Sequence, residues 1–493
     1  MSTRGERISE QRLQKLNNIR AMGIDPYPPR FKRTHTARQT IDLLGQQEKE
    51  SKSEQVTVTV AGRVMANRSM GKVSFLDLRD ESGKIQLMVG KDRIKEADFN
   101  LFKELDIGDF IGATGKVFRT RSKEPTIEVN SLTLLAKSLQ ALPEKWHGLS
   151  DVEIRYRQRY LDLISNEEVR KTFRLRSNII NNVRQFLDGR GFIEVETPIL
   201  WPDAGGATAK PFITHHNALD RDLYLRIATE LHLKRLLIGG FEKVYELGRI
   251  FRNEGIDATH NPEFTTLESY EAYADYNEVM KMVEEMVSTL AQQVLGTTAI
   301  EFAGTKIELK PPWQRISLRE AITQHSGIDF VQYPNAEMLR SKMREKGIEV
   351  DPQKNWAHLV DDLLSTFVEP KLLQPVFLVD YPASLSPLAK RKPGEARVVE
   401  RFEAFAGGME IANAFTELND PLEQRERFLQ QARERQQHDV EETVDEDFLL
   451  ALEHGMPPAG GLGVGIDRLV MLFTNNQSIR EVILFPQLKE KGE

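Results

Sequence analysis

The sequence has no cysteine among its 493 residues. Disulfide bonds, thiolate nucleophiles and cysteine-ligated metals are therefore excluded. No apolar run approaches the roughly 20 residues that a membrane-spanning helix needs. Residues 1–10 are polar, so we expect no secretory signal. These absences predict a cytoplasmic protein with no membrane partner.

Two common nucleotide-binding signatures are also missing. No G-x-x-x-x-G-K-[ST] occurs, and Gly461, Gly463 and Gly465 alternate without forming G-x-G-x-x-G. The net charge of −7 gives no general sign of nucleic-acid binding, although residues 1–38 carry a local excess of basic side chains. Such an arm can follow phosphates, but it is more often the solvated face of a helix.

The length, with 40% hydrophobic and 29% charged residues, fits a globular protein of two domains. Residues 1–55 are interpreted as a helix near 9–22 followed by a linker, because Pro26, Pro28 and Pro29 end the helical pattern. A β-rich domain is expected at 56–142, and a larger domain at 150–493, after a connector that contains Pro and Gly.

From residue 56 the apolar period changes to two. The runs V-T-V-T-V-A-G-R-V, V-S-F-L-D-L-R-D and I-Q-L-M-V are followed by a helix near 94–105 and strands near 109–118 and 126–134. Five short strands with one helix predict an OB-fold, although a generic small β-barrel has the same pattern. Phe75 and Gln86 lie on strands where an OB-fold binds bases. The alternative for Phe75 is a place in the barrel core.

Residues 251–270 (F-R-N-E-G-I-D-A-T-H-N-P-E-F-T-T-L-E-S-Y) predict an antiparallel hairpin. Arg252 and Glu254 are expected to share one face of its first strand, and Phe264 to lie opposite Arg252 on the returning strand. A guanidinium suits a phosphate or carboxylate, and a flat ring suits a base. The hairpin therefore favours a bound nucleotide. A surface hairpin with an ordinary ion pair is the alternative.

The segment 403–419 (E-A-F-A-G-G-M-E-I-A-N-A-F-T-E-L-N) carries Glu403, Glu410 and Glu417 close to an apolar strand. Three acids at one site require cations, and Mg²⁺ and an amine are the two candidates. Pairing with Arg397, Arg401 or solvent is the alternative.

Three motifs carry a resemblance to a known family. F-R-N-E-G with H-N-P-E-F is similar to motif 2 of class II aminoacyl-tRNA synthetases, and G-L-G-V-G-I-D-R, ending at Arg468, is similar to motif 3. Residues 175–198 resemble motif 1, which forms the dimer interface in that class; a helix packed within its own domain is the alternative. From near residue 5 to the C-terminus the chain resembles bacterial-type lysyl-tRNA synthetases.

This resemblance implies an α+β protein. An OB-fold anticodon-binding domain at 56–142 would precede a catalytic domain at 150–493, built on an antiparallel sheet flanked by helices. The implied activity is the activation of L-lysine with ATP to lysyl-adenylate, followed by transfer of lysine to the 3′ end of tRNA(Lys). A homodimer that uses Mg²⁺ is implied as well.

The resemblance also implies the site residues. Arg252 and Arg468 would be catalytic. ATP would contact Arg252, Glu254, His260, Asn261, Phe264, Glu403 and Arg468, and Glu403 and Glu410 would hold Mg²⁺. Lysine would contact Gly206, Glu230, Arg252, Glu268, Tyr270, Asn413, Phe415 and Glu417. The anticodon would contact Arg68, Phe75, Gln86 and Glu124. Ala412 and Ala414 replace the family's glycines, so their methyl groups are expected to tighten the pocket.

Three other functions were weighed against this one. An asparaginyl- or aspartyl-type enzyme should offer a cation where Glu230 stands, whereas a buried ammonium needs carboxylates. A lysine ligase that acts on a protein would not need the barrel. A non-catalytic tRNA-binding protein would be expected to lose Arg252 or Arg468, and both are present.

Overall fold

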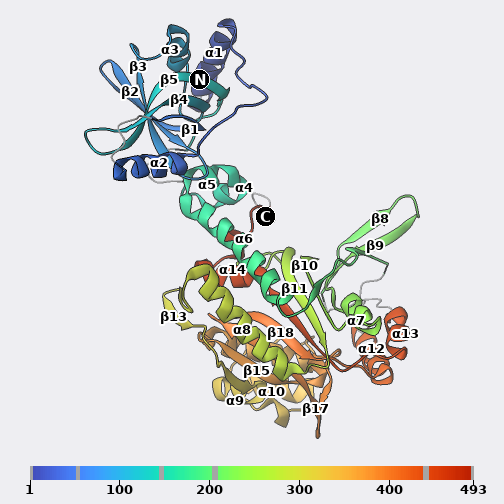
Figure 1. Ribbon diagram of the computed structural model, residues 1–493. Helices are drawn as coiled ribbons and strands as arrows, with labels where there is room; N and C mark the ends of the chain where they lie inside the picture. The colour runs from blue at the N-terminus through green and yellow to red at the C-terminus, as the bar shows by residue number, and fades with distance from the viewer. Residues whose placement is uncertain (1–3, 51–55, 144–148, 203–208, 437–443, 490–493) are drawn as a thin grey trace. The chain divides into compact units, whose positions relative to one another are not determined.

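The protein is described by a computed structural model that covers residues 4–50, 56–143, 149–202, 209–436 and 444–489. The chain divides into two compact units, residues 1–148 and 149–493 (Figure 1).

The N-terminal unit contains a closed five-stranded barrel. Its elements are β1 (Thr57–Met70), β2 (Val73–Arg79), β3 (Lys84–Gly90), α3 (Glu96–Lys103), β4 (Phe110–Arg119) and β5 (Pro125–Ala136). The strand order is β1-β2-β3-β5-β4, and β1 closes the ring by pairing with both β2 and β4. Strands β3 and β5 pair in parallel. The predicted OB-fold is confirmed, with its single helix between β3 and β4.

The two faces of β2 have different surroundings. Leu76 and Leu78 are fully buried in the hydrophobic cluster of the barrel. Phe75 is only half-buried and belongs to the opposite face, where it pairs with Arg68 on β1 and Met88 on β3. The alternative that placed Phe75 in the core is therefore wrong.

Two helices precede the barrel, α1 (Arg4–Ala21) and α2 (Ala37–Lys49). In α1 the buried Arg12 donates to the carbonyls of Gln140 at 2.6 Å and Ile107 at 2.9 Å, and Lys15 pairs with Asp106 at 2.6 Å. These two basic residues fasten the helix to the barrel. Helix α2 was not expected; it begins at a Thr36 capping box, in a segment interpreted as linker.

The larger unit is built on one sheet. It consists of β6 (Ile193–Glu194), β10 (Lys243–Phe251), β11 (Glu263–Ala272), β14 (Gln314–Ser317), β15 (Val376–Pro382), β16 (Arg391–Lys392), β17 (Glu395–Ala406), β18 (Met409–Thr416) and β19 (Ala459–Gly465). The order is β14-β15-β17-β18-β19-β11-β10-β6, with β16 paired to β17. Only the β14–β15 and β10–β6 pairs are parallel. This confirms the predicted antiparallel sheet.

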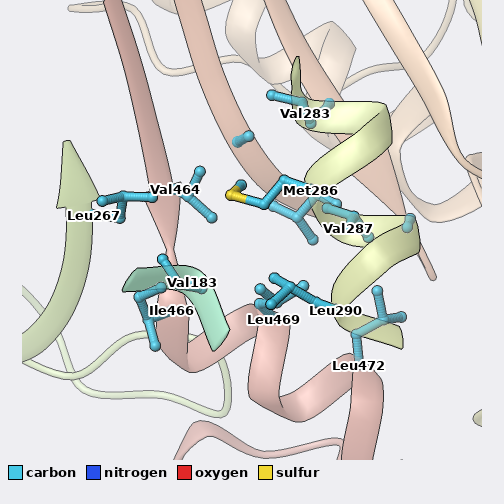
Figure 2. Packing of buried hydrophobic residues seen from close by; sticks show 14 of the residues in the cluster. Val183, Leu267, Val283, Met286, Val287, Leu290, Val464, Ile466, Leu469 and Leu472 are labelled. Atoms are coloured by element: carbon cyan, nitrogen blue, oxygen red, sulfur yellow. The ribbon is translucent and has the colours of Figure 1, made fainter. Parts of the chain in front are cut away.

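Helices α6 (Glu167–Asp188), α8 (Tyr276–Leu295) and α14 (Ile466–Thr474) cover one face of this sheet (Figure 1). Figure 2 shows Val464 of β19 between Leu267 of β11 and Met286 of α8, and Leu469 of α14 beside Leu290 of α8. Full burial of each such side chain contributes about 1.5–3 kcal/mol. This face is therefore the main core. Two further hydrophobic clusters cover parts of the opposite face, and the rest of that face remains for a site.

The remaining elements complete the unit. The helices are α4 (Val152–Arg157), α5 (Arg159–Ser165), α7 (Glu230–Ile238), α9 (Leu318–Ser326), α10 (Ala336–Glu345), α11 (Trp356–Leu363), α12 (Pro421–Gln436), α13 (Glu446–Glu453) and α15 (Ile479–Val482). Short helical turns are η1 (Phe330–Gln332), η2 (Leu364–Val368), η3 (Glu369–Lys371) and η4 (Ala383–Leu385). Strands β7 (Leu200–Trp201), β8 (Ile213–His216) and β9 (Arg221–Leu225) form a small sheet, and β12 (Ala299–Phe302) pairs with β13 (Thr305–Glu308). Each helix in the described ranges is too short or too polar to cross a bilayer.

The segment that resembles motif 1 forms α6 and β6. Ile179, Val183 and Leu187 of α6 are fully buried in the core cluster, so this helix face packs within its own domain. The following strand, β6, has only two residues, and its Ile193 is 50% exposed. The homodimer remains a prediction. Its interface would have to use the exposed residues that follow α6, such as Ile193.

Candidate active site

Backbone pairing aligns two rows of residues across the sheet. One row runs through Glu268, Gly463, Asn413 and Glu403, and the next through Tyr270, Gly461, Phe415 and Arg401. On each strand the two rows lie two residues apart, so both occupy the same face. The intervening residues Leu462, Ala414 and Phe402 belong to the core cluster on the other face. Strand alternation thus turns the polar residues toward one side.

A cavity of about 570 Å³ opens on this face. That volume is within the range of small-molecule sites. Among its lining residues are Glu230, Arg252, Glu254, His260, Asn261, Phe264, Glu268, Tyr270, Glu403, Glu410, Asn413, Phe415 and Arg468. All of these were predicted site residues. Glu417 is fully buried and does not line the cavity, and Gly206 lies outside the described residues.

The hairpin β10–β11 forms with the predicted antiparallel pairing. The Arg252 guanidinium carbon lies 5.3 Å from the centre of the Phe264 ring, as the sequence suggested. However, β10 ends at Phe251, so Arg252 and Glu254 lie in the connecting loop, and their expected place on a strand is wrong. The loop follows from Gly255 and Pro262, which disfavour a continued ladder.

Arg468 lies in the first turn of α14, where it donates to the Glu410 carboxylate at 3.1 Å and to the Glu410 carbonyl at 2.9 Å. The residue before it, Asp467, accepts from the backbone N–H of Thr265 at 2.7 Å and from Arg176 at 2.6 Å. Asp467 therefore ties the start of α14 to β11 and α6. It was not predicted as a site residue.

Glu403 is held by two residues that sequence reasoning missed as site residues. Its Oε1 accepts from Arg401 at 2.5 Å, and its Oε2 accepts from the Tyr381 hydroxyl at 2.8 Å. Burial raises the pKa of Glu403 to about 7; Arg401 opposes the rise and Glu410 adds to it. The alternative pairing with Arg401 is thus realised. Arg401 stands two positions before Glu403, so strand alternation alone could have found it.

The other end of the cavity is acidic. Glu268 accepts from the backbone N–H of Thr229 at 3.1 Å, and burial, with Glu230 adding to it, raises the pKa of Glu268 to about 7. Glu230, the first residue of α7, pairs with Lys234 at 2.6 Å. The Lys234 ammonium also pairs with Glu417. Lys234 was missed, although its spacing of four from Glu230 on a helix was the available signal.

Gly461 gives the Glu417 carboxylate its space. A Cβ at this position would overlap Glu417 Oε1 and stand 2.6 Å from Tyr270 Cε1. The expected tightening by Ala412 and Ala414 is not general, because both belong to the core cluster and only Ala412 also borders the cavity. Alternation directs Asn413 and Phe415 toward the site instead.

In the N-terminal unit three of the predicted anticodon residues, Arg68, Phe75 and Gln86, lie on the outer face of β1, β2 and β3. Phe75 pairs with Arg68, and Asp77 pairs with Gln86. Arg68 binds Asp77 at 2.7 Å, and Gln86 accepts from Thr126 at 3.0 Å. Glu124 lies in the loop between β4 and β5, two residues before Thr126. Three of the four predicted residues therefore lie on adjacent strands, and the fourth lies in a loop next to β5, whose Thr126 bonds Gln86.

Comparison with known proteins agrees with this geometry. Residues 151–489 match the family of tRNA synthetases class II (D, K and N), and residues 58–135 match the family of the OB-fold nucleic acid binding domain.

Similar chains of full length are also known. The chain is 56% identical over 490 residues to the lysine–tRNA ligase of Dehalococcoides mccartyi (strain ATCC BAA-2266 / KCTC 15142 / 195). The aligned residues cover 99% of this chain and 98% of the relative. It is 54% identical over 486 residues to the lysine–tRNA ligase of Moorella thermoacetica, with 98% of each chain covered. The chain belongs to the class II tRNA synthetases of the D, K and N group, and within that group its full-length relatives carry the name lysine–tRNA ligase.

Proposed function

We propose that this protein is a lysine–tRNA ligase, which joins L-lysine to tRNA(Lys) at the expense of ATP. The observation that carries the proposal is the acidic end of a cavity whose other end offers arginines. Phe264 and Tyr270 are six residues apart on β11, so the two ends lie about 20 Å apart at roughly 3.3 Å per residue. That length suits a nucleotide and an amino acid placed end to end.

The reaction needs no nucleophilic side chain. A carboxylate oxygen of lysine attacks the α-phosphorus of ATP, and the bond to the bridging oxygen breaks as pyrophosphate leaves. A hydroxyl at the 3′ end of tRNA then attacks the carbonyl carbon of the adenylate, and AMP leaves. Catalysis of this kind rests on positioning and charge stabilisation.

Arg252 is suited to hold the α-phosphate together with the lysine carboxylate, because its guanidinium borders the cavity beside Phe264. Phe264 would stack on adenine, with Glu254, His260 and Asn261 around the nucleotide. Arg468 would bind the γ-phosphate, and its hydrogen bonds to Glu410 keep it at the cavity wall.

Mg²⁺ would be held by Glu403 and Glu410 together with ATP phosphates. Within the described residues no three His, Asp or Glu side chains are arranged to bind a metal ion by themselves. Mg²⁺ usually takes only one or two carboxylates and completes its shell with phosphates and water, so two acids suffice. Burial is the main cause of the raised pKa of Glu403, and the neighbouring Glu410 carboxylate adds to it. A cation bound to Glu403 would oppose both effects. When bound, the ion would neutralise charge on the phosphates.

The lysine side chain would point to Glu230 and Glu417, with Tyr270 and Phe415 along its stem and Asn413 at the wall. Glu268 and Gly206 would meet the α-ammonium. A pocket for aspartate would not offer three acids, since like charges would repel an acidic substrate.

The barrel would read the anticodon of tRNA(Lys) through Arg68, Phe75, Gln86 and Glu124. An aromatic ring flanked by polar side chains on an open strand face is the arrangement with which OB-folds stack and bond to bases. A lysine ligase acting on a protein would have no need of this face.

Two further proposals concern assembly and location. We infer a homodimer through residues 175–198, supported by the exposed apolar side chain of Ile193 within this segment and by that of Ile199 directly after it. A cytoplasmic location follows from the substrate, since charged tRNA is used in protein synthesis.

The test is a charging assay with unfractionated tRNA, ATP and Mg²⁺, in which each amino acid is supplied in labelled form. Label from lysine alone should enter the tRNA, and alkaline hydrolysis should release it as free lysine. Incorporation of aspartate or asparagine in place of lysine would contradict the proposal.

A further inference from the structure

Lys234 is a charged side chain to which the proposed reaction gives no role. It lies on α7, its side chain is completely buried, and it does not line the cavity. An ammonium group buried in this way requires nearby negative charge, because an uncompensated charge inside a protein is very costly.

Two carboxylates supply the compensation. The Nζ atom of Lys234 lies 2.6 Å from Glu230 Oε1 and pairs with Glu417 Oε2. The rings of Phe415 and Phe448 lie 5.5 Å and 6.0 Å from the same atom and exclude water. Lys234 therefore bridges the two acids that are proposed to receive the substrate ammonium.

Lys234 uses only one oxygen of each acid. Glu417 Oε1 is buried and has no hydrogen-bond partner in the described part of the chain. This atom occupies the space left by the missing side chain of Gly461, which does line the cavity. The other oxygen of Glu230, Oε2, is not used by Lys234. One oxygen from each acid thus remains for a second ammonium group.

We propose that Lys234 is a positioning residue that prepares the lysine pocket. It holds Glu230 and Glu417 together as charged groups and gives the three side chains one net negative charge, which matches a single substrate ammonium. The inference rests on the proposed lysine–tRNA ligase function and assigns a specificity-determining role within its site.

Titratable groups from several elements surround the cluster. Glu230 on α7 and Glu268 and Tyr270 on β11 interact electrostatically with the Glu417 carboxylate, and the rings that lie over Lys234 from β18 and α13 are the uncharged Phe415 and Phe448. Burial raises the pKa of Glu417 well above its usual range, Lys234 opposes this rise, and Glu230 and Glu268 add to it. Burial acts to lower the pKa of Lys234, but Glu230 and Glu417 outweigh it and raise that pKa. Lys234 is therefore the cation that favours ionised carboxylates here.

Without Lys234 two adjacent carboxylates would have to share a proton, as like charges in close contact do. An entering ammonium would then have to expel that proton.

Lys234→Met removes the charge at similar length, and Lys234→Arg keeps it. Titration calorimetry of L-lysine at pH 7.5, in buffers that differ in ionisation enthalpy, counts the protons released.

We expect Lys234→Met to bind lysine at least tenfold more weakly and to release up to one proton more than the wild type. Lys234→Arg should keep the wild-type proton count. Wild-type affinity and proton count in Lys234→Met would overturn the inference. If the wild type itself fails to bind lysine, the proposed function falls as well, which distinguishes the two failures.

A second pair of variants tests the same charge balance without leaving Glu230 and Glu417 together in the absence of a cation. In Glu417→Gln, Lys234 and Glu230 cancel, so the substrate ammonium meets a neutral site that contains a fixed cation. Adding Lys234→Met restores one net negative charge. The double variant should therefore bind lysine at least tenfold more tightly than Glu417→Gln alone. An equal or weaker affinity of the double variant would overturn the role of Lys234.

Discussion

Phe75→Ala offers a way to separate the two units by function. The ring is half-buried on the outer face of the barrel, between Arg68 and Met88, and it is not part of the hydrophobic cluster. Loss of a ring that stacks on a base costs roughly 1–3 kcal/mol of binding. This corresponds to about 5- to 150-fold in an equilibrium constant, at tenfold per 1.4 kcal/mol.

The effect should appear in only one of the two half-reactions. We expect kcat/KM for tRNA charging to fall by one to two orders of magnitude, since the tRNA is bound less tightly. Lysine-dependent ATP–pyrophosphate exchange needs no anticodon and should stay close to wild type. Because a half-buried ring forfeits roughly half of the 1.5–3 kcal/mol of full burial, the loss of stability should be about 1 kcal/mol.

Leu76→Ala is the matched control. Leu76 is the next residue on the same strand, but it is fully buried in the barrel core. Its truncation should lower the free energy of unfolding of the barrel by roughly 2–5 kcal/mol. Both reactions and a thermal melt are measured on each preparation. If Phe75→Ala lost both activities together with a large drop in melting temperature, or charged tRNA at the wild-type rate, the anticodon role would be refuted.

Three further outcomes are expected. Glu230→Gln or Glu417→Gln removes one of the two carboxylates proposed to pair with the buried ammonium group of bound lysine, and a buried charge without its partner costs roughly 3–5 kcal/mol. Lysine KM should rise at least tenfold while ATP KM changes far less. Unchanged lysine kinetics in both variants would remove Glu230 and Glu417 from the pocket. The pKa of Glu268 is raised to about 7, and protonation removes the negative charge that this residue would offer to the α-ammonium group of lysine. Lysine affinity should therefore fall as pH drops from 8 to 6, and Glu268→Gln should flatten that profile. An unchanged slope in Glu268→Gln would count against a contact between Glu268 and the α-ammonium group. At micromolar concentration the protein should sediment as a dimer, and a fully active monomer would contradict the interface at 175–198.

Most of the fold could be predicted from the strand patterns in the sequence. The period of two in residues 56–136 and in 263–272 predicts which faces of the strands are polar, and the structure pairs these strands in the expected sense. The OB-fold and the antiparallel sheet followed from those patterns and from the resemblance. Helix α2 escaped prediction because its apolar residues are few, and only contact with the barrel buries Ala37 and Leu44.

Partners in ion pairs were harder to predict. Arg401 and Lys234 each lie within four residues of a predicted acid, and this spacing places each on the same face as that acid. The spacing does not show which ion pairs form. That depends on the sheet register and on the burial of Glu417, which brings a residue after β18 to a helix far away in the chain. The end of β10 at Phe251 likewise depends on the loop that follows, and a period of two does not show where a strand stops.

The most direct test of the central claim is ATP–pyrophosphate exchange with each of the twenty amino acids and with norleucine, which has the carbon chain of lysine but no ε-ammonium group. The acidic end of the cavity predicts exchange that depends on lysine and a rate with norleucine lower by several orders of magnitude. Exchange driven by another amino acid, or equally well by norleucine, would contradict the assignment of Glu230 and Glu417 to the substrate ammonium and with it the proposed function.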